Sequence, residues 1–304
     1  MSLALSAAVP VPLGDSGLVV GPIGWGMWRF AGTERPRARL LVETALEIGC
    51  TLFDTADVYG HDADGFGAAE QLLGAVLREV PSLRERMVLA TKAGVRPPVP
   101  YDSSAEYLQR CCEDSLRRLG VERIDLFQIH RPDLLAHPAE VARALERLRG
   151  AGKIRAVGVS NYSAGQTETL TTHLAFPLAS LQPELSALAI EALSDGVLDL
   201  ALRRGLGVLA WSPLAGGRLG TTASAAAARE RRVLAALDAV ARRTERLRAA
   251  VACAWVMAHP ARPVPLLGTQ SPARIREAAQ AFEVSMTRAE WYDILAAARG
   301  EPLP

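Results

Sequence analysis

The chain has 304 residues, of which 49% are hydrophobic and 22% are charged, and its formal net charge is +1. This composition excludes global disorder, because so many apolar residues can bury a large core. A net charge near zero gives no electrostatic footprint for nucleic acid or for an anionic membrane. No apolar run reaches about 18 residues, so we expect no membrane span.

Short apolar runs alternate along the chain with longer helical patterns. A short N-terminal hairpin over residues 11–18 is predicted first, closing one end of the domain. Most of the later runs are continuous apolar stretches, which are typical of parallel strands buried on both faces. In chain order the predicted strands are Val19–Ile23, Thr51–Asp54, Met87–Lys92, Ile124–His130, Ile154–Val159, Ala179–Gln182, Gly207–Trp211 and Val264–Leu267.

The helical patterns between these runs carry start and stop signals. Capping boxes are predicted at Ser103–Glu106, Ser163–Gln166 and Thr287–Glu290. Glycines that end a helical run shortly before a strand are Gly49, Gly120 and Gly150. Eight strand–helix units predict one (β/α)8 TIM barrel domain over residues 1–304.

Two features bear on alternatives to this barrel. An open doubly wound sheet would need a G-x-G-x-x-G turn after the first strand, and Gly24-Trp25-Gly26 has no third glycine. Residues 213–228 break the strand–helix rhythm and are predicted to form a long functional loop before a helix.

Cysteine usage indicates the compartment. Cys50, Cys111, Cys112 and Cys253 show neither CxxC nor zinc-ligand spacing, which favours free thiols in a reducing cytosol. Met1–Pro12 lacks the basic leader and unbroken apolar run of a signal peptide. We therefore expect a cytoplasmic protein without a metal site.

Polar residues recur where the predicted strands end, and in a barrel those ends carry the reactive groups. In order they are Asp54, Lys92, His130, Ser160-Asn161, Gln182, Trp211-Ser212 and Gly268-Thr269. Solvated loops explain polar residues in general. They explain less well an aspartate, a lysine and a histidine that close successive apolar runs.

Tyr59 lies in the loop that follows Asp54. Lys92 starts from a buried stem and needs a carboxylate partner, for which Asp54 is the natural candidate. The ammonium is predicted to lower the pKa of the Tyr59 phenol from about 10, so that Tyr59 can donate a proton to a carbonyl oxygen. His130 is predicted to hydrogen-bond the same oxygen. Taken singly, a loop tyrosine is usually a packing residue, a strand-end histidine is usually a satisfied core polar group, and an Asp–Lys pair is often only an ion pair.

The order of these motifs resembles the aldo-keto reductase superfamily, and especially a bacterial subgroup of oxidoreductases, from about Val19 to Phe282. The motifs that carry the resemblance are Phe53–Gly60, Thr91-Lys92, Ile129–Asp133, Gly152–Asn161 and Ala210–Leu214. The resemblance implies a (β/α)8 barrel that reduces an aldehyde or ketone to an alcohol, or catalyses the reverse, with NAD(P)H. It also implies a catalytic tetrad with Tyr59 as general acid, formed by Asp54, Tyr59, Lys92 and His130.

The resemblance further implies a nicotinamide cofactor site. The nicotinamide end would be bound by Gly26, Met27, Asp54, Ser160, Asn161, Gln182 and by Trp211 stacking on the ring. The pyrophosphate would be lined by Ser212, Leu214, Gly216, Gly217 and Arg218. The adenosine 2′-phosphate would be held by Gly268, Thr269 and Arg274, which predicts NADPH/NADP, with NADH as the alternative. The chain departs from the family pattern in having Gly268 where many members have lysine and Ala278 where many have asparagine.

The predicted substrate is a small-molecule carbonyl or alcohol, bound by Trp25, Trp28, Tyr59, His130 and Arg131. The chain is expected to be a monomer with no nucleic-acid or membrane partner. One alternative is a cofactor-binding regulatory module that senses redox state with little turnover. Another is a metal-dependent hydrolase, but only His130 of the five histidines closes a strand.

Overall fold

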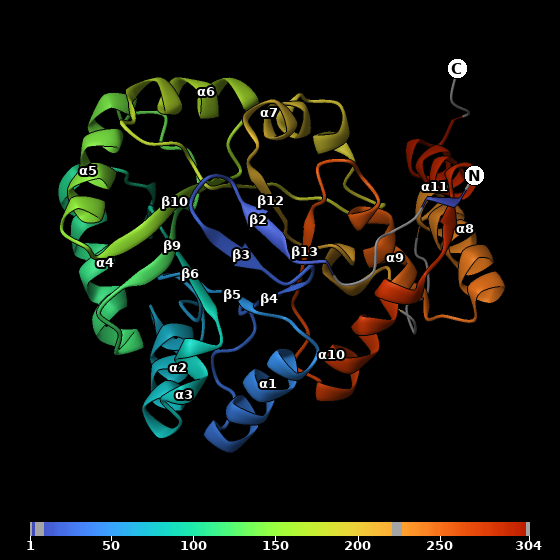
Figure 1. The fold of residues 1–304 in the computed structure, drawn as a ribbon, viewed down its shortest axis with the longest axis horizontal. Helices are drawn as coiled ribbons and strands as arrows, with labels where there is room; N and C mark the ends of the chain where they lie inside the picture. The colour runs from blue at the N-terminus through green and yellow to red at the C-terminus, as the bar shows by residue number, and fades with distance from the viewer. Residues whose placement is uncertain (1, 4–8, 221–226, 302–304) are drawn as a thin grey trace.

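In the computed structural model of the chain, eight parallel strands form a closed barrel surrounded by helices (Figure 1). The structure describes residues 2–3, 9–220 and 227–301. The barrel strands are β4 (Gly24–Gly26), β5 (Leu52–Asp54), β6 (Val88–Ala93), β9 (Ile124–Ile129), β10 (Ile154–Ser160), β11 (Ser180–Gln182), β12 (Gly207–Ala210) and β13 (Val264–Leu267). Because β13 pairs with β4 and closes the sheet, the predicted (β/α)8 barrel is confirmed and the open sheet is wrong.

Helices and short turns cover the outside of the barrel. The helices are α1 (Arg35–Glu47), α2 (Ala68–Glu79), α3 (Ser82–Glu85), α4 (Ala105–Leu119), α5 (Pro138–Gly150), α6 (Ala164–His173), α7 (Val197–Arg204), α8 (Ala228–Thr244), α9 (Arg248–Met257), α10 (Pro272–Ala278) and α11 (Arg288–Arg299). The 3-10 turns are η1 (Glu191–Leu193), η2 (Ala215–Gly217) and η3 (Ala279–Glu283). Outside the barrel, β1 (Ser2–Leu3) pairs with β14 (Met286–Thr287), and β7 (Val95–Arg96) pairs with β8 (Val99–Tyr101).

Helix starts follow the sequence closely. Ser163 and Thr287 each form the predicted capping box, in which side chain and backbone satisfy each other. The third start differs by one residue, because Ser104 and not Ser103 caps α4 and accepts a hydrogen bond from the Tyr107 amide at 3.4 Å.

The first predicted barrel strand, Val19–Ile23, is wrong. The apolar residues Leu18–Val20 form β3 of the hairpin, and the barrel strand is the glycine-rich β4 that follows. A Cβ at Gly24 would lie 2.6 Å from the end of the Leu266 side chain, so any larger residue would have to displace that side chain. Glycine-rich strands lack the β-branched pattern by which strands are predicted.

The N-terminal hairpin closes the amino end of the barrel, as predicted. Strands β2 (Val11–Leu13) and β3 (Leu18–Val20) pair antiparallel and lie across the barrel in the view of Figure 1. Their buried side chains form one apolar cluster with inward-facing barrel residues, among them Leu52, Ala90 and Leu126.

Strand alternation then places polar groups at the other end of the barrel. Side chains two positions apart share a face of a strand. In β5, Leu52 belongs to the apolar cluster and Asp54 follows on the same face; in β6, Ala90 and Lys92 are related in the same way. The barrel interior is therefore apolar at its amino end and polar at its carboxyl end.

Three further predictions concern the long loop before α8, the cysteines and membrane-spanning helices. The predicted long loop ends where α8 begins at Ala228, while residues 221–226 lie outside the described residues. All four cysteines are buried free thiols. Across residues 2–3, 9–220 and 227–301, no helix is both long and apolar enough to cross a membrane.

Candidate active site

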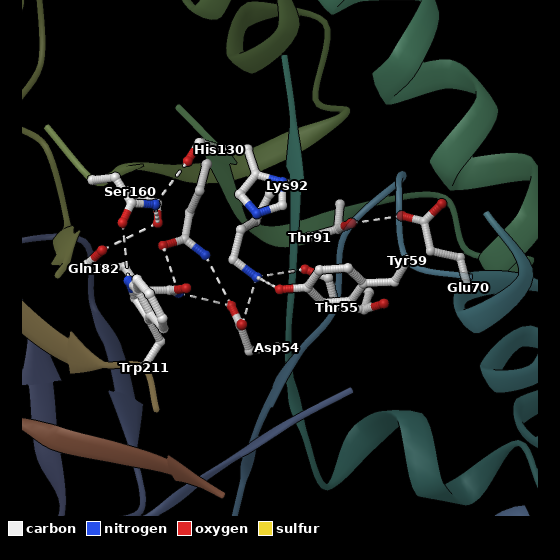
Figure 2. A network of polar contacts seen from close by, with 12 residues as sticks. Asp54, Thr55, Tyr59, Glu70, Thr91, Lys92, His130, Ser160, Gln182 and Trp211 are labelled. Carbon is white, nitrogen blue, oxygen red and sulfur yellow. Dashed lines mark hydrogen bonds and ion pairs between the residues drawn. The ribbon is translucent and has the colours of Figure 1, made fainter. Parts of the chain in front are cut away.

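Lys92 lies at the centre of the polar end of the barrel (Figure 2). Its side chain is completely buried, and Nζ donates to Asp54 Oδ2 at 2.5 Å, to the Thr55 carbonyl at 2.9 Å and to Tyr59 Oη at 3.1 Å. An ammonium has three protons, and each has an acceptor here. The Tyr59 oxygen accepts one of them, so the phenol's own proton stays available for donation outward.

Asp54 is fixed from its other side by two amides. Its Oδ1 accepts hydrogen bonds from Gln128 Nε2 and Gln182 Nε2, both at 3.0 Å. Gln182 also donates to Gln128 Oε1 at 3.2 Å. Sequence reasoning missed Gln128, although it stands two positions before His130 in a buried run, on the same face of the strand.

A glycine on the adjacent strand makes room for these amides. A Cβ at Gly158 would lie 2.2 Å from Ser180 Oγ and 3.2 Å from Gln128 Cγ. No larger residue fits without displacing one of these neighbours, so the glycine of β10 is part of the support for Asp54.

The loop that carries Tyr59 is attached to β6 through its backbone. The Thr55 amide donates to the Ala90 carbonyl at 2.9 Å, and the Asp57 amide donates to the Lys92 carbonyl at 3.0 Å. The helix after the loop is tied to the same strand, because the Thr91 hydroxyl donates to buried Glu70 at 2.6 Å. Strand β6 thus fixes both the ammonium and the phenol.

The electrostatics of the tetrad differ in one respect from expectation. Burial raises the pKa of Tyr59 and outweighs the opposing effect of Lys92, so the predicted lowering of the phenol pKa is wrong for this structure. Burial lowers the pKa of Lys92, but the Asp54 carboxylate and the Tyr59 oxygen more than offset it, so the net pKa is raised. Burial, with the charges of Lys92 and Arg131, holds the pKa of His130 well below its ordinary value. The site therefore combines a protonated phenol, an ammonium and a neutral imidazole.

Two rings pack edge-on against the Tyr59 ring. The His130 and Trp28 ring centroids lie 5.8 Å and 5.3 Å from that of Tyr59. His130 Nδ1 is buried without a partner, whereas the Trp28 side chain is 59% exposed. The tyrosine therefore lies at a boundary between the buried network and solvent.

The predicted nicotinamide residues form one network with the tetrad. Asn161 Nδ2 donates to Ser160 Oγ at 2.9 Å and to the His130 carbonyl at 3.1 Å, and Trp211 Nε1 donates to Asn161 Oδ1 at 3.0 Å. Ser160 Oγ donates to the Gln182 carbonyl at 3.1 Å. These contacts join residues at or next to the carboxyl ends of four strands, β9, β10, β11 and β12.

Backbone strain is concentrated at the same strand ends. Five described residues other than glycine have positive φ, and three of them are Asn161 (59°), Ser212 (56°) and Ala215 (48°). Gly216 and Gly217 follow with φ of 70° and 104°. Such strained conformations cluster at ligand sites, and here they occupy the segments that the resemblance assigns to the nicotinamide and the pyrophosphate. The residues therefore fit a dinucleotide.

Other predicted cofactor residues have distinct environments. Gly26 ends β4, and the Met27 amide donates to the Asp54 carbonyl at 2.9 Å while the Met27 side chain is fully buried. Leu214 is half-buried and Arg218 is exposed, with its Nε donating to the Ala215 carbonyl at 3.2 Å.

The prediction that Trp25 lines the substrate pocket is wrong. Its side chain is fully buried and packs edge-on against Phe30 and Phe53. Because Trp25 stands between Gly24 and Gly26 in a strand, it faces opposite to their inward positions. It belongs to the core beneath the helices.

A cavity of about 640 Å³ opens beside the tetrad. Its wall combines aromatic, charged and backbone groups from four loops and includes the predicted Trp28, His130 and Arg131. The lining residues are Trp28, Ala31, Val58, Gly60, His61, Asp62, Ala63, Asp64, Val95, Pro97, Tyr101, His130 and Arg131. Sequence reasoning missed the β7–β8 hairpin and its Tyr101, because its strands are too short to give a pattern.

Comparison with known proteins adds to this geometry. Residues 22–299 match the model of the aldo/keto reductase family. Over 295 residues, which are 96% of each chain, the sequence is 53% identical to a 6-dehydroglucose reductase of Novosphingobium aromaticivorans. A second 6-dehydroglucose reductase, from Agrobacterium fabrum, is 35% identical over 93% of this chain and 96% of its own. The solved glycerol dehydrogenase of Gluconobacter oxydans superposes with a TM-score of 0.83 at 28% identity and covers 99% of this chain and 98% of its own.

Proposed function

The chain belongs to the aldo/keto reductase family, and from that premise we propose that it reduces a sugar-derived carbonyl with NADPH, using Tyr59 as the general acid. Family membership makes the chain a carbonyl-reducing oxidoreductase. The observation that carries the catalytic assignment is the Lys92 ammonium, which donates to the Tyr59 oxygen and leaves the phenol proton free.

The chain's own residues supply the proton transfer and its control. A bound nicotinamide supplies the hydride that reduces the carbonyl carbon. Tyr59 then gives its proton to the carbonyl oxygen, and Lys92 stabilises the phenolate that remains. His130, neutral and buried beside the phenol, orients that oxygen by a hydrogen bond. Asp54 keeps Lys92 charged and in place.

The strained turns and the amide network support a site for the cofactor. Ser160 and Asn161 would hold the nicotinamide amide, because amides need both donors and acceptors. Trp211, fixed through Asn161, would stack on the ring. The η2 turn would receive the pyrophosphate, and the segment that starts at Gly268 would receive the adenosine end.

The sugar assignment rests on the relatives and on the cavity. Two relatives are named for 6-dehydroglucose, whose name denotes a glucose oxidised at carbon 6. Trp28 offers an apolar face suited to the C–H face of a sugar, while Asp62 and Asp64 offer acceptors for hydroxyl groups. Arg131 adds a donor beside His130. A wall of this kind suits a polyhydroxylated aldehyde better than it suits a purely apolar aldehyde.

A direct assay tests this proposal. The purified chain is given 6-dehydroglucose, p-nitrobenzaldehyde and glyceraldehyde in turn, each with NADPH and with NADH, and cofactor oxidation is followed by absorbance. We expect the highest kcat/KM with 6-dehydroglucose and NADPH. Equal kcat/KM for p-nitrobenzaldehyde would contradict the sugar assignment, and no turnover of any carbonyl would contradict the function itself.

We also propose a cellular compartment and an oligomeric state for the protein. Four buried free thiols suit a reducing compartment, so we place the protein in the cytoplasm. We also propose that it acts as a monomer, because the tetrad and the cavity are built from one chain. Sedimentation at micromolar concentration measures the assembly state.

A further inference from the structure

The face of strand β6 that is turned away from the tetrad carries a second polar network. Side chains alternate along a strand, so Thr91 points out of the barrel while Lys92 points into it. The Thr91 hydroxyl donates to Glu70 Oε1 at 2.6 Å (Figure 2). The other carboxylate oxygen, Oε2, accepts from Arg118 Nε at 2.7 Å. Glu70 therefore joins β6 to two helices, its own α2 and the α4 of Arg118.

Glu70 is also linked to Tyr59 through the backbone. The Ala69 amide, directly before Glu70, donates to the Tyr59 carbonyl at 3.2 Å. Thr91 directly precedes Lys92, whose Nζ donates to Tyr59 Oη at 3.1 Å. These contacts form a closed ring in which Tyr59 is held to β6 twice, once by its phenol oxygen and once through Ala69 and Glu70. The position of the phenol relative to the ammonium is therefore fixed from two sides.

Arg118 contacts the end of the loop that carries Tyr59. Its guanidinium carbon lies 6.0 Å from the centroid of the Phe66 ring. The next residue, Gly67, precedes α2 with φ of 82°, and a Cβ at this position would overlap the Arg118 guanidinium. Together with the ion pair to Glu70, these contacts hold the loop on the side away from the tetrad.

The ion pair allows Glu70 to act as a charged acceptor in the interior. Its side chain is fully buried, and 16% of the Arg118 side chain is exposed. A carboxylate buried without a partner is strongly disfavoured, so the arginine compensates the charge of Glu70. The 2.6 Å contact from Thr91 lies within the range of about 2.5–2.7 Å for a hydroxyl that donates to a carboxylate. The strand is therefore held by a strong hydrogen bond.

We propose that Glu70, supported by Arg118, is a positioning residue for Tyr59. It holds Thr91 from outside the barrel, so that the strand and the loop keep the phenol against the Lys92 ammonium. The inference rests on the proposed role of Tyr59 as general acid. Neither Glu70 nor Arg118 lines the cavity beside the tetrad, so both act through other residues. Misplacing a reacting group by about 1 Å can cost about 10²-fold in rate, so remote contacts of this kind can affect turnover.

The experiment removes the hydroxyl of Thr91 and keeps the shape of its side chain. Thr91→Val loses the donor to Glu70, whereas Thr91→Ser retains it. For the carbonyl that the parent reduces best, we expect kcat of Thr91→Val to be about tenfold lower, with KM and NADPH affinity within about twofold of the parent. The solvent deuterium isotope effect on kcat should rise, because proton transfer from Tyr59 becomes slower. Thr91→Ser should recover kcat to within about threefold of the parent.

Thr167→Val is the matched control for a loss of stability. Thr167 is also buried, and its hydroxyl donates to the Ser163 carbonyl at 2.8 Å at the start of α6. This variant should have a lower thermal midpoint and the kcat of the parent when it is assayed well below that midpoint. An equal fall of kcat in Thr167→Val and Thr91→Val would overturn the proposal, because the loss of any buried hydroxyl would then have the same effect.

A double variant tests whether Thr91 acts through Glu70. Glu70→Gln should lower kcat, because the neutral amide loses the ion pair with Arg118. Adding Thr91→Val to it should cost little more, since both changes remove one contact. Arg118→Met should lower kcat in the same way, whereas Arg117→Met, at an exposed position on the same helix, should not.

Two results would overturn the positioning role of Glu70. One is a parental kcat in Thr91→Val. The other is a pair of losses from Glu70→Gln and Thr91→Val that multiply in the double variant, since the two residues would then act independently. A parent that reduces no carbonyl would contradict the proposed function itself, and this inference with it.

Discussion

Lys92 and Gln128 stand directly opposite each other in neighbouring strands, and their side chains bind the two oxygens of one carboxylate, that of Asp54. The pairing register alone places them at the same level of the barrel. The Lys92 ammonium is thus oriented through an acid that is itself held by amides.

This relationship predicts a positioning role for Gln128. In Gln128→Leu, Asp54 keeps only the amide of Gln182, so Lys92 should be less well oriented. We expect kcat to fall about tenfold, with cofactor affinity and the thermal midpoint little changed. The control is Gln109→Leu, at an exposed glutamine. A parental kcat in Gln128→Leu would show that Gln182 alone suffices.

Replacing Tyr59 by phenylalanine removes the proposed proton donor and leaves the ring. Turnover should fall at least about a hundredfold, because general acid catalysis contributes about 10²–10⁴-fold. NADPH affinity, measured by fluorescence, should stay within twofold of the parent. Tyr292→Phe changes a tyrosine of α11 in the same way and serves as the control. Parental reduction of carbonyls by Tyr59→Phe would make another residue the acid.

The pKa directions predict a flat pH profile for reduction. Burial raises the pKa of Tyr59 above its ordinary value, so the phenol stays protonated to beyond about pH 10. Burial keeps the pKa of His130 well below its ordinary value, so the imidazole does not titrate near neutrality. We expect kcat for reduction to be constant from about pH 7 to pH 9. A limb near pH 6.5 that disappears in His130→Ala would contradict a neutral imidazole.

A second buried carboxyl group links stability to pH. Asp57 is fully buried, and burial, followed by the nearby charge of Glu70, raises its pKa well above the ordinary value. The folded protein thus keeps a proton that the unfolded chain releases above about pH 4, and the stability that this group contributes is lost as pH rises toward the folded pKa.

Asp57→Asn removes this dependence. The free energy of unfolding should therefore fall less between about pH 5 and pH 8 in Asp57→Asn than in the parent, by about 1.4 kcal/mol for each pKa unit crossed. Urea titrations at several pH values give this difference, with Asp293→Asn at an exposed position as the control. Identical slopes in all three proteins would mean that Asp57 is ionised when folded.

The sequence predicts the barrel because its apolar runs and glycine stops are local signals. Seven of the predicted strands overlap barrel strands, and the exception is β4, where glycines packed close to the Leu266 side chain replace the apolar pattern. The wrong prediction for Trp25 has a related cause. The first strand was predicted at Val19–Ile23 instead of Gly24–Gly26, so Trp25 was not recognised as a strand residue whose side chain points outward, between two inward-facing glycines.

The positions of the predicted tetrad follow from local signals, because Asp54, Lys92 and His130 lie at or next to the ends of successive strands and Tyr59 follows in the loop after Asp54. Gln128 and Gly158 are not as easily predicted, since their roles depend on packing across three strands. The pKa of Tyr59 could not be predicted from neighbouring residue types alone. Its direction depends on how completely the phenol is removed from water, and that is a property of the assembled fold.

The hairpin closes the amino end of the barrel, and substitutions at this end have different consequences from substitutions at the carboxyl end. Its buried side chains pack in an apolar cluster with the amino-end interior of the barrel, so substitutions there act mainly on whether the chain stays folded. Substitutions in the loops at the opposite rim are filtered by which molecules the enzyme accepts. Substitutions in these loops can therefore change substrate specificity without altering the apolar packing at the amino end of the barrel.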